Sequence, residues 1–224
     1  MRLVPPLPSL PLPGPLARAR TRALARTRRA GVNVLMRAAR LPVTRPVVEP
    51  AMRLLFDSLA PTWEQIRADP TYRVGFTEAL GHLPRGFRPR RTLDVACGTG
   101  IATAAMLERW PGSNVLGTDI SPRMVELATE LVPEARFEVA SVHGLPYDDG
   151  AFDLVTALDG LIDPAELLRV LHRKGRLLIV YSKGGTTPIS RPLDELAGAF
   201  ADHGAISDAH TDGEAHVLVV RHGR

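Results

Sequence analysis

The chain has 224 residues, enough for one α/β domain with a modest extension, and 45% of them are hydrophobic, so a full core can be buried. No apolar run approaches the roughly 20 residues of a membrane-spanning helix, and the single cysteine, Cys97, excludes an internal disulfide and fits a reducing, cytoplasmic setting. The formal net charge of +4 is unevenly placed, since residues 1–50 hold ten arginines and one acid, Glu49. The remaining chain has 18 basic and 23 acidic residues and offers no basic track for nucleic acid.

Residues 1–45 form a basic leader rich in proline and arginine. Prolines interrupt residues 1–15, which blocks regular structure and also the continuous apolar stretch of a secretory signal. Residues 16–40 have the pattern of a basic helix with a thin apolar stripe, which suits peripheral contact with an anionic membrane or with nucleic acid. A solvated, partly disordered arm is the alternative reading. Met36 and Met52 are alternative start positions that would remove most of the arginines.

Residues 46–91 are predicted to form a helical cap. Apolar residues recur at helical spacing over 47–60 and over 71–83. Pro61 and Pro70 are expected to separate these two helices. Aromatic residues of this segment could line a pocket or simply pack the helices onto a sheet; they are Phe56, Trp63, Tyr72 and Phe76.

From residue 92 onward strands and helices alternate, which predicts a domain over 92–224 built on a parallel sheet covered on both faces. The expected strands are 92–96, 114–118, 136–140, 152–157 and 176–182, and the expected helices are 101–109, 121–131, 163–171 and 191–203. Residues 205–208 and 215–220 flank a turn at Asp212-Gly213, which predicts an antiparallel hairpin. The predicted fold is therefore α/β, a Rossmann-like, doubly wound, mostly parallel seven-stranded sheet with a C-terminal antiparallel hairpin and N-terminal helices.

The most informative segment is residues 92–100, Thr-Leu-Asp-Val-Ala-Cys-Gly-Thr-Gly, where an apolar strand ends in a loop of small residues. Gly98 and Gly100 let a ligand approach the backbone, and the N–H groups at the start of the next helix suit a carboxylate or phosphate. Asp94 would repel a diphosphate but can accept bonds from an ammonium group. Asp119, at the end of the next strand, can hold two ribose hydroxyls. A ligand with a carboxylate, an ammonium group and a ribose, such as S-adenosylmethionine, fits this pattern better than a dinucleotide.

These segments resemble the class I S-adenosylmethionine-dependent methyltransferases, in the small-molecule group that includes quinone-biosynthesis enzymes. Residues 93–100 match the first motif of that family, Asp119 matches its ribose-binding acid, and residues 144–155 match the stretch that enters the fourth strand. The resemblance implies transfer of a methyl group from S-adenosylmethionine to a small-molecule acceptor, with the attacked O, N or C atom left open. The cofactor-binding residues that it implies are Asp94, Ala96, Gly98, Gly100, Asp119, Ile120, Ser141, Val142 and Leu158.

No catalytic dyad is evident, and none is required, since the methyl donor is already activated and the protein mainly positions the reactants. Asp159 is a candidate base, whereas Asp163, which precedes a proline, is expected to cap a helix. His143 and His172 are the histidines of interest by position. Cys97 is expected to pack rather than react, and no Cys/His cluster has the spacing of metal ligands.

Two other classes stay open. Ser141 stands where the family often has an acid for the adenine amino group, and the stretch between residues 155 and 169 is short, so a non-catalytic, S-adenosylmethionine-binding regulatory relative is one alternative. A membrane- or nucleic-acid-associated protein that uses the arginine-rich leader is the other. The acidic body argues against a nucleic-acid methyltransferase.

Overall fold

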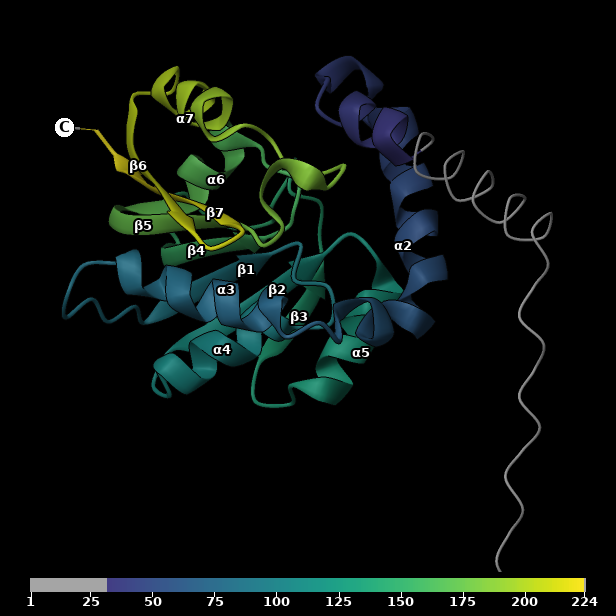
Figure 1. Cartoon of the computed structure of the whole chain (residues 1–224), viewed down its shortest axis with the longest axis horizontal. Helices are drawn as coiled ribbons and strands as arrows, with labels where there is room; N and C mark the ends of the chain where they lie inside the picture. The colour runs from purple at the N-terminus through teal and green to yellow at the C-terminus, as the bar shows by residue number, and fades with distance from the viewer. Residues whose placement is uncertain (1–31, 224) are drawn as a thin grey trace, which may run out of the picture.

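A seven-stranded sheet with strand order β3-β2-β1-β4-β5-β7-β6 forms the centre of the computed structural model, which describes residues 32–223 (Figure 1). The strands are β1 (Arg91–Val95), β2 (Asn114–Asp119), β3 (Arg136–Val139), β4 (Phe152–Leu158), β5 (Leu171–Tyr181), β6 (Ala205–Asp212) and β7 (Ala215–His222). Strands β1 to β5 are parallel, and β7 runs antiparallel to both β5 and β6. The predicted fold class, including the C-terminal hairpin, is confirmed.

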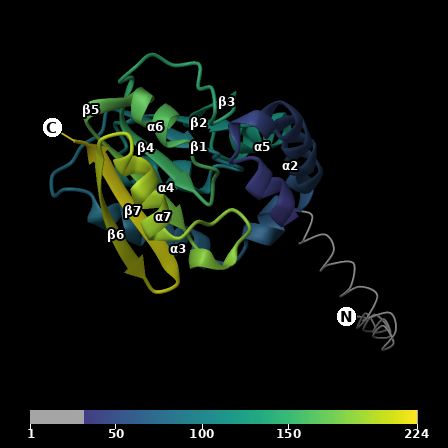
Figure 2. The ribbon, with the colours of Figure 1, turned by 90° about the horizontal axis from the view of Figure 1, so that it is seen from above.

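Helices cover both faces of this sheet, as Figures 1 and 2 show from two directions. The helices are α2 (Arg45–Arg67), α3 (Thr71–Ala79), α4 (Ile101–Arg109), α5 (Pro122–Leu131), α6 (Pro164–Val170) and α7 (Leu193–Ala201), and residues 32–38 are also helical. Short 3₁₀ turns lie at Pro42–Thr44, Leu80–His82 and Gly184–Thr186. Helices α3 and α4 pack on one face, and α6 and α7 pack on the other. Within residues 32–223 no helix is long and apolar enough to cross a membrane.

Strand β5 shows why the sheet is buried on both sides. Leu177 and Ile179 belong to the core beneath α6 and α7, whereas Leu178 and Val180 belong to the core beneath α3 and α4. All four are at most 1% exposed. Alternate side chains of a strand point to opposite faces, so a strand covered on both sides requires the continuous apolar run found here.

The N-terminal helical segment differs from the prediction at Pro61. Helix α2 continues without a break from Arg45 to Arg67 and contains both Pro50 and Pro61, although proline removes one backbone hydrogen bond from a helix. Side chains on either side of Pro61 are anchored to the sheet domain: Asp57 accepts the Ser121 hydroxyl and Glu64 accepts the Thr99 hydroxyl. These tertiary contacts hold the helix together across the proline.

Strand β5 is also longer than predicted, because residues 171–175, expected to close a helix and form a turn, belong to the strand. Phe152 pairs with Leu171 and Leu154 pairs with Arg176, so the register shifts and the intervening residues of β5 form a bulge. Gly175 lies in this bulge, where an added β-carbon would come within 2.8 Å of the Asp153 carbonyl. The glycine therefore allows the turn-like segment to remain within the sheet.

Helix α2 lies across the carboxyl end of the parallel strands, at the right of Figure 1. The strand order reverses between β1 and β4, and open α/β sheets bind ligands at such a reversal, outside the carboxyl ends of the strands. The predictions for residues 1–31 fall outside the described residues.

Candidate functional site

Gly98, in the turn between β1 and α4, is where the backbone comes close to the end of β2. Its φ of +54° lies in the left-handed region, and its N–H donates to Asp119 Oδ2 at 2.9 Å. A β-carbon at this position would lie 3.0 Å from the indole nitrogen of Trp63. The site requires glycine, because only glycine adopts this conformation without strain and leaves room beside the indole.

Asp119, the last residue of β2, is 7% exposed and joins the loops that follow β1 and β2. Its Oδ1 accepts the N–H of Ser121 at 2.9 Å, while its Oδ2 accepts that of Gly98. Burial raises the pKa of Asp119, and these two N–H groups act in the opposite direction. Each oxygen of an ionised carboxylate has a further lone pair, so Asp119 keeps the capacity to accept two hydroxyl groups. The glycine loop and the second carboxylate thus lie side by side.

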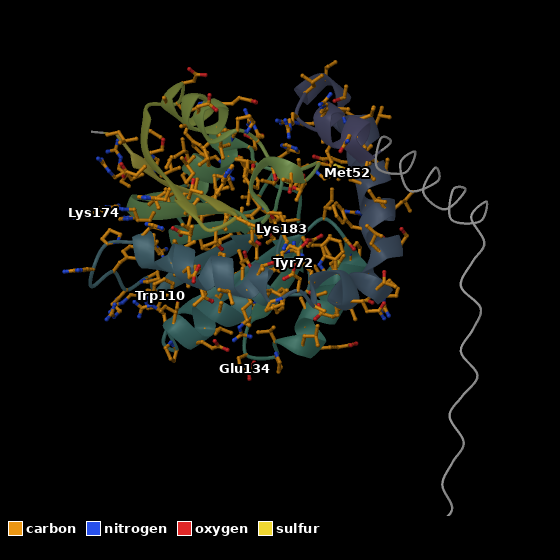
Figure 3. The ribbon with its side chains drawn as sticks, viewed as in Figure 1. Met52, Tyr72, Trp110, Glu134, Lys174 and Lys183 are labelled. Carbon is orange, nitrogen blue, oxygen red and sulfur yellow. The ribbon has the colours of Figure 1, made fainter. Side chains whose placement is uncertain are left out.

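A cavity of about 270 Å³ lies between the carboxyl ends of the strands and helix α2. Six of the residues predicted to bind the cofactor line it: Ala96, Gly98, Asp119, Ile120, Ser141 and Val142. Its apolar wall comes mainly from the N-terminal helices: Met36, Met52, Leu55, Phe56, Leu59 and Ile189. Trp63 and Tyr72 also line it, and Lys183 lies over the Tyr72 ring, 5.6 Å from its centroid (Figure 3).

Asp94 lies away from this cavity, fully buried in the sheet. Its carboxylate accepts the Thr103 hydroxyl at 2.6 Å and the Thr156 hydroxyl at 3.0 Å. Burial raises the pKa of Asp94 from 3.8 to about 6, and the two hydroxyls act against that rise. These bonds tie the end of β1 to α4 and β4, so Asp94 shapes the loop from below.

Three other predicted residues lie outside the cavity within the described chain. Leu158, together with Asp94, borders a second cavity of about 10 Å³. Gly100, with φ of +91°, precedes α4, and its N–H donates to the Cys97 carbonyl. Phe76 is fully buried and packs α3 onto the sheet, so its alternative role as a packing residue is the one observed.

Helix α2 supplies site residues that the sequence reasoning missed. Its charged side chains contact the loops after four different strands; the pairs are Arg45–Asp163, Glu49–Ser141, Arg53–Ile120, Asp57–Ser121, Glu64–Thr99 and Arg67–Asp159. In the Arg53 pair the acceptor is a backbone carbonyl. The signal was present as charged residues at four-residue spacing from 45 to 57, which places them on one side of a helix.

Asp159 lines the cavity but is already engaged. Its Oδ2 accepts the Arg67 guanidinium at 3.3 Å and the Ser182 hydroxyl at 2.6 Å, and its Oδ1 accepts the Ser182 N–H at 3.0 Å. Its φ of +50° is unusual for a residue other than glycine, and such strain requires anchoring of this kind. Arg67 in turn lies over Tyr72, 4.4 Å from the ring centroid. Through Arg67, Asp159 therefore holds the C-terminal end of α2 in place.

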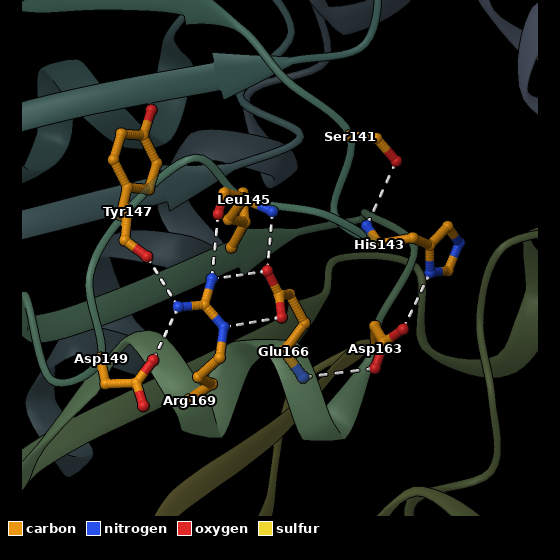
Figure 4. A network of polar contacts seen from close by, with 8 residues as sticks. All are labelled: Ser141, His143, Leu145, Tyr147, Asp149, Asp163, Glu166 and Arg169. Atoms are coloured by element: carbon orange, nitrogen blue, oxygen red, sulfur yellow. Dashed lines mark hydrogen bonds and ion pairs between the residues drawn. The ribbon is translucent and has the colours of Figure 1, made fainter.

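His143 lies in the turn after β3, and its Nδ1 is 3.0 Å from Asp163 Oδ2 (Figure 4). Asp163 caps α6 as predicted, since its Oδ1 accepts the Glu166 N–H. Its Oδ2 also lies 2.9 Å from the Arg45 guanidinium. The loops after β3 and β4 and helix α2 therefore meet at one carboxylate.

Arg169 of α6 organises the segment that enters β4 (Figure 4). It donates to the carbonyls of Leu145 and Tyr147 and to the carboxylates of Asp149 and Glu166. Glu166 also accepts the Leu145 N–H at 2.7 Å. This network fixes the backbone that leads from the His143 turn into the sheet.

Cys97 and the remaining histidine of interest have no reactive placement. Cys97 is buried, and burial raises the pKa of its thiol well above its ordinary value, so a thiolate is disfavoured. His172 lies in the β5 bulge, where its Nδ1 accepts the Lys174 N–H. Among residues 32–223 no group of His, Cys, Asp and Glu side chains could hold a metal ion.

Comparison with known proteins finds sequences similar to part of this chain. Residues 92–179 match the family model described as a methyltransferase domain. The chain is 34% identical over 148 residues to a demethylmenaquinone methyltransferase of Deinococcus radiodurans, covering 58% of this chain and 59% of that protein. It is 40% identical over 103 residues to the demethylmenaquinone methyltransferase of Thermus thermophilus, covering 41% and 47% of the two chains. The chain thus spans about half the length of these relatives.

Solved structures share the fold. A SAM-dependent methyltransferase from Aquifex aeolicus superposes with a TM-score of 0.59 at 19% identity, covering 71% of this chain and 97% of that one. The [4+2]-cyclase SpnF superposes with a TM-score of 0.62 at 15% identity, covering 77% and 96%. At these identities the likeness concerns the fold, which hosts more than one chemistry. Part of the chain therefore resembles a methyltransferase domain and proteins named as demethylmenaquinone methyltransferases.

Proposed function

We propose that this protein transfers the methyl group of S-adenosylmethionine to an apolar small molecule. The observation that carries the proposal is the contact between the Gly98 N–H and Asp119 at the wall of the 270 Å³ cavity. The contact joins a backbone that a ligand can approach to a carboxylate with lone pairs to spare. Relatives named as methyltransferases support it.

The residues of the cavity fit the methyl donor. Asp119 would accept the two ribose hydroxyls, and Ile120 and Val142 would contact the adenine ring. Ala96 and Gly98 would lie along the amino acid part of the donor. When bound, the donor supplies a methyl group already activated by a sulfonium, so the tasks left to the protein are to position the reactants and to exclude water.

The acceptor side of the cavity is apolar. Met36, Met52, Leu55 and Ile189 line it, together with Phe56. Such a wall selects a ligand with a large hydrocarbon or aromatic part. The relatives' names concern demethylmenaquinone, and we extend to this chain the corresponding class, a quinone in its reduced form.

Within this proposal Asp159 holds helix α2 over the cavity and does not act as a base. Both of its oxygens already accept hydrogen bonds from Arg67 or Ser182. Ser141 contributes less to donor binding than an acid would, since its hydroxyl donates to Glu49. Asp94 acts on the donor only through the loop above it.

Peripheral membrane contact and a cytoplasmic location belong to the same proposal. Large apolar side chains point to solvent on the N-terminal helices: Val34, Leu41, Val43, Val47 and Leu54, which are 54–85% exposed. The exposed Arg37 and Arg53 lie in the same segment and would favour an anionic bilayer, the source of an apolar acceptor. The full-length protein should float with phosphatidylglycerol vesicles and lose this property in a variant that starts at Met52. Flotation that is equal for both would contradict the membrane role.

Calorimetry with S-adenosylhomocysteine tests the donor site. Replacing Asp119 by alanine should weaken binding about tenfold or more, because the ribose hydroxyls lose their acceptor. Asp119→Asn keeps the size of the side chain, and its affinity for S-adenosylhomocysteine should lie between those of the wild type and Asp119→Ala. Asp153→Ala is the matched control, since Asp153 also accepts two backbone N–H groups but at the opposite end of the sheet. Equal affinity in all four proteins would refute the ribose role.

Turnover is tested separately with the reduced form of a short-chain demethylmenaquinone as methyl acceptor. Mass spectrometry should detect a product heavier by one methylene unit and an equal amount of S-adenosylhomocysteine. Donor binding without turnover on quinols, phenols or carboxylic acids would favour the regulatory alternative.

A further inference from the structure

His143, in the turn that follows β3, is among the residues that line the cavity. Its side chain is 7% exposed. Its Nδ1 contacts Asp163, but its Nε2 is buried and has no hydrogen-bond partner within the protein. An unpaired polar atom in a buried position is unfavourable unless a ligand or solvent molecule completes it.

The contact with Asp163 determines which nitrogen carries the proton. Burial acts to raise the pKa of Asp163, but the bonds from His143 and the Glu166 N–H and the charge of Arg45 outweigh it and lower the pKa. An ionised carboxylate can only accept, so Nδ1 must be the donor. In the neutral ring, Nε2 then carries a lone pair, the state required of a base.

We propose that Nε2 of His143 accepts the proton that the methyl acceptor loses during transfer. The inference rests on the proposed function, and it assigns a catalytic role that the donor site does not provide. The acceptor's electron pair forms the new bond to the methyl carbon as the carbon–sulfur bond breaks, and the sulfonium becomes a neutral thioether. The proton of the attacking hydroxyl, or of the quinol hydroxyl beside an attacking ring carbon, passes to Nε2.

Asp163 is the positioning residue of this pair. It orients the ring through Nδ1 and would stabilise the imidazolium that forms. The charged groups around His143 come from three places: Arg45 and Glu49 from α2, Asp163 from the loop before α6, and Glu166 from α6. Arg45 also pairs with Asp163, so the orientation of the ring depends on α2 being in place.

Nitrogen-15 NMR of labelled protein tests the tautomer without any turnover. In the wild type, Nδ1 of His143 should show the shift of a protonated nitrogen and Nε2 that of an unprotonated one; His143→Gln identifies the signals. Adding S-adenosylhomocysteine and a reduced short-chain demethylmenaquinone should move the Nε2 signal more than the Nδ1 signal. A proton on Nε2 in the neutral ring would overturn the proposal whether or not that quinol binds.

Kinetics then separate this role from donor binding. His143→Gln should leave affinity for S-adenosylhomocysteine within about twofold and lower kcat by about 100-fold or more, the range lost with a general base. Added imidazole should restore part of the rate in His143→Ala and none in His172→Ala, the matched control. Asp163→Asn should lower kcat and leave KM for the acceptor within about twofold, as expected of a residue that orients the base. A His143→Gln protein with wild-type kcat would refute the base, whereas a wild type that fails to bind the donor would refute the proposed function.

Discussion

Replacing Asp94 by asparagine tests how burial and hydrogen bonding balance at the centre of the sheet. Asp94 is fully buried, and two threonine hydroxyls are its side-chain partners. Asparagine has nearly the same shape, and a hydroxyl can also accept from its amide, so both contacts can be kept. The substitution therefore mainly removes the ability to ionise.

The direction in which stability changes with pH follows from the pKa of Asp94, which is about 6 in the folded protein against an ordinary 3.8. Between these values the folded state holds a proton that the unfolded state has lost, so this contribution to stability is full below pH 3.8 and is lost as pH rises through 6. The full effect is about 3 kcal/mol, since one pKa unit corresponds to about 1.4 kcal/mol. Between pH 4.5 and pH 7.5 about 2 kcal/mol of it should disappear.

Urea unfolding followed by tryptophan fluorescence measures this difference. The free energy of unfolding of Asp94→Asn, relative to the wild type, should increase by about 2 kcal/mol from pH 4.5 to pH 7.5. A constant difference would mean that Asp94 does not titrate in this window. A difference that decreases with pH would mean that the hydroxyls of Thr103 and Thr156 outweigh burial and hold the pKa below 3.8.

Asp153→Asn is the control with the opposite slope. Burial acts to raise the pKa of Asp153, but the N–H groups of Arg90 and Arg91 and the charge of Arg91 outweigh it and lower the pKa. A lowered pKa gives stability that is present above pH 3.8 and lost as pH falls through the folded value. The Asp153 variant should therefore become less stable relative to the wild type as pH rises toward about 4.5, and it should show almost no change from pH 4.5 to pH 7.5, where the Asp94 variant changes.

Two further substitutions test packing and the α6 network by the same unfolding measurement. Gly117→Ala should lower the free energy of unfolding by about 1–3 kcal/mol, because the new β-carbon would lie 2.5 Å from the Phe137 ring. Gly112→Ala is the control, since nothing lies within 4 Å of its β-carbon. Equal losses of stability in the two variants would contradict the packing argument. Arg169→Met should lower the free energy of unfolding by about 1.5–3 kcal/mol, since Glu166 and two carbonyls lose their donor. Arg169→Lys should recover only part of this loss, because an ammonium group lacks the planar, forked donors of a guanidinium. Full recovery by lysine would show that the guanidinium geometry is not needed.

The sheet and the glycine loop of residues 96–100 could be predicted from local sequence because each depends on residues close together in the chain. Strand periodicity and the turn glycines located every strand, and Gly98 and Asp119 do meet as expected. Asp94 could not be placed in this way. Whether its carboxylate faces a ligand or the sheet depends on Thr103 and Thr156, and the second of these is 62 residues away.

The His143 turn also depends on residues that lie far apart in the sequence. The residue that holds its ring, Asp163, was predicted only as a helix cap, which it is. Besides the N–H of α6 that it caps, Asp163 contacts His143 on the loop after β3 and Arg45 on helix α2. A local pattern can identify the cap, but a carboxylate with three partners from three segments requires the fold.

The charged side of α2 shows most directly why its contacts with the strand loops were missed, although residues 46–91 were predicted to form a helical cap. Its charges alternate in sign at four-residue spacing, Arg45, Glu49, Arg53 and Asp57, a pattern typical of a solvent-exposed helix that pairs its own side chains. Here the partners of Glu49, Asp57, Glu64 and Arg67 lie 35 to 92 residues away, one in each successive strand loop. These four residues are eight, seven and three positions apart, so the four-residue spacing does not by itself follow the spacing of the strands. The pattern that would build an exposed ion-pair ladder therefore also occurs in a helix docked on the edge of a parallel sheet, and only the presence of that edge decides between the two.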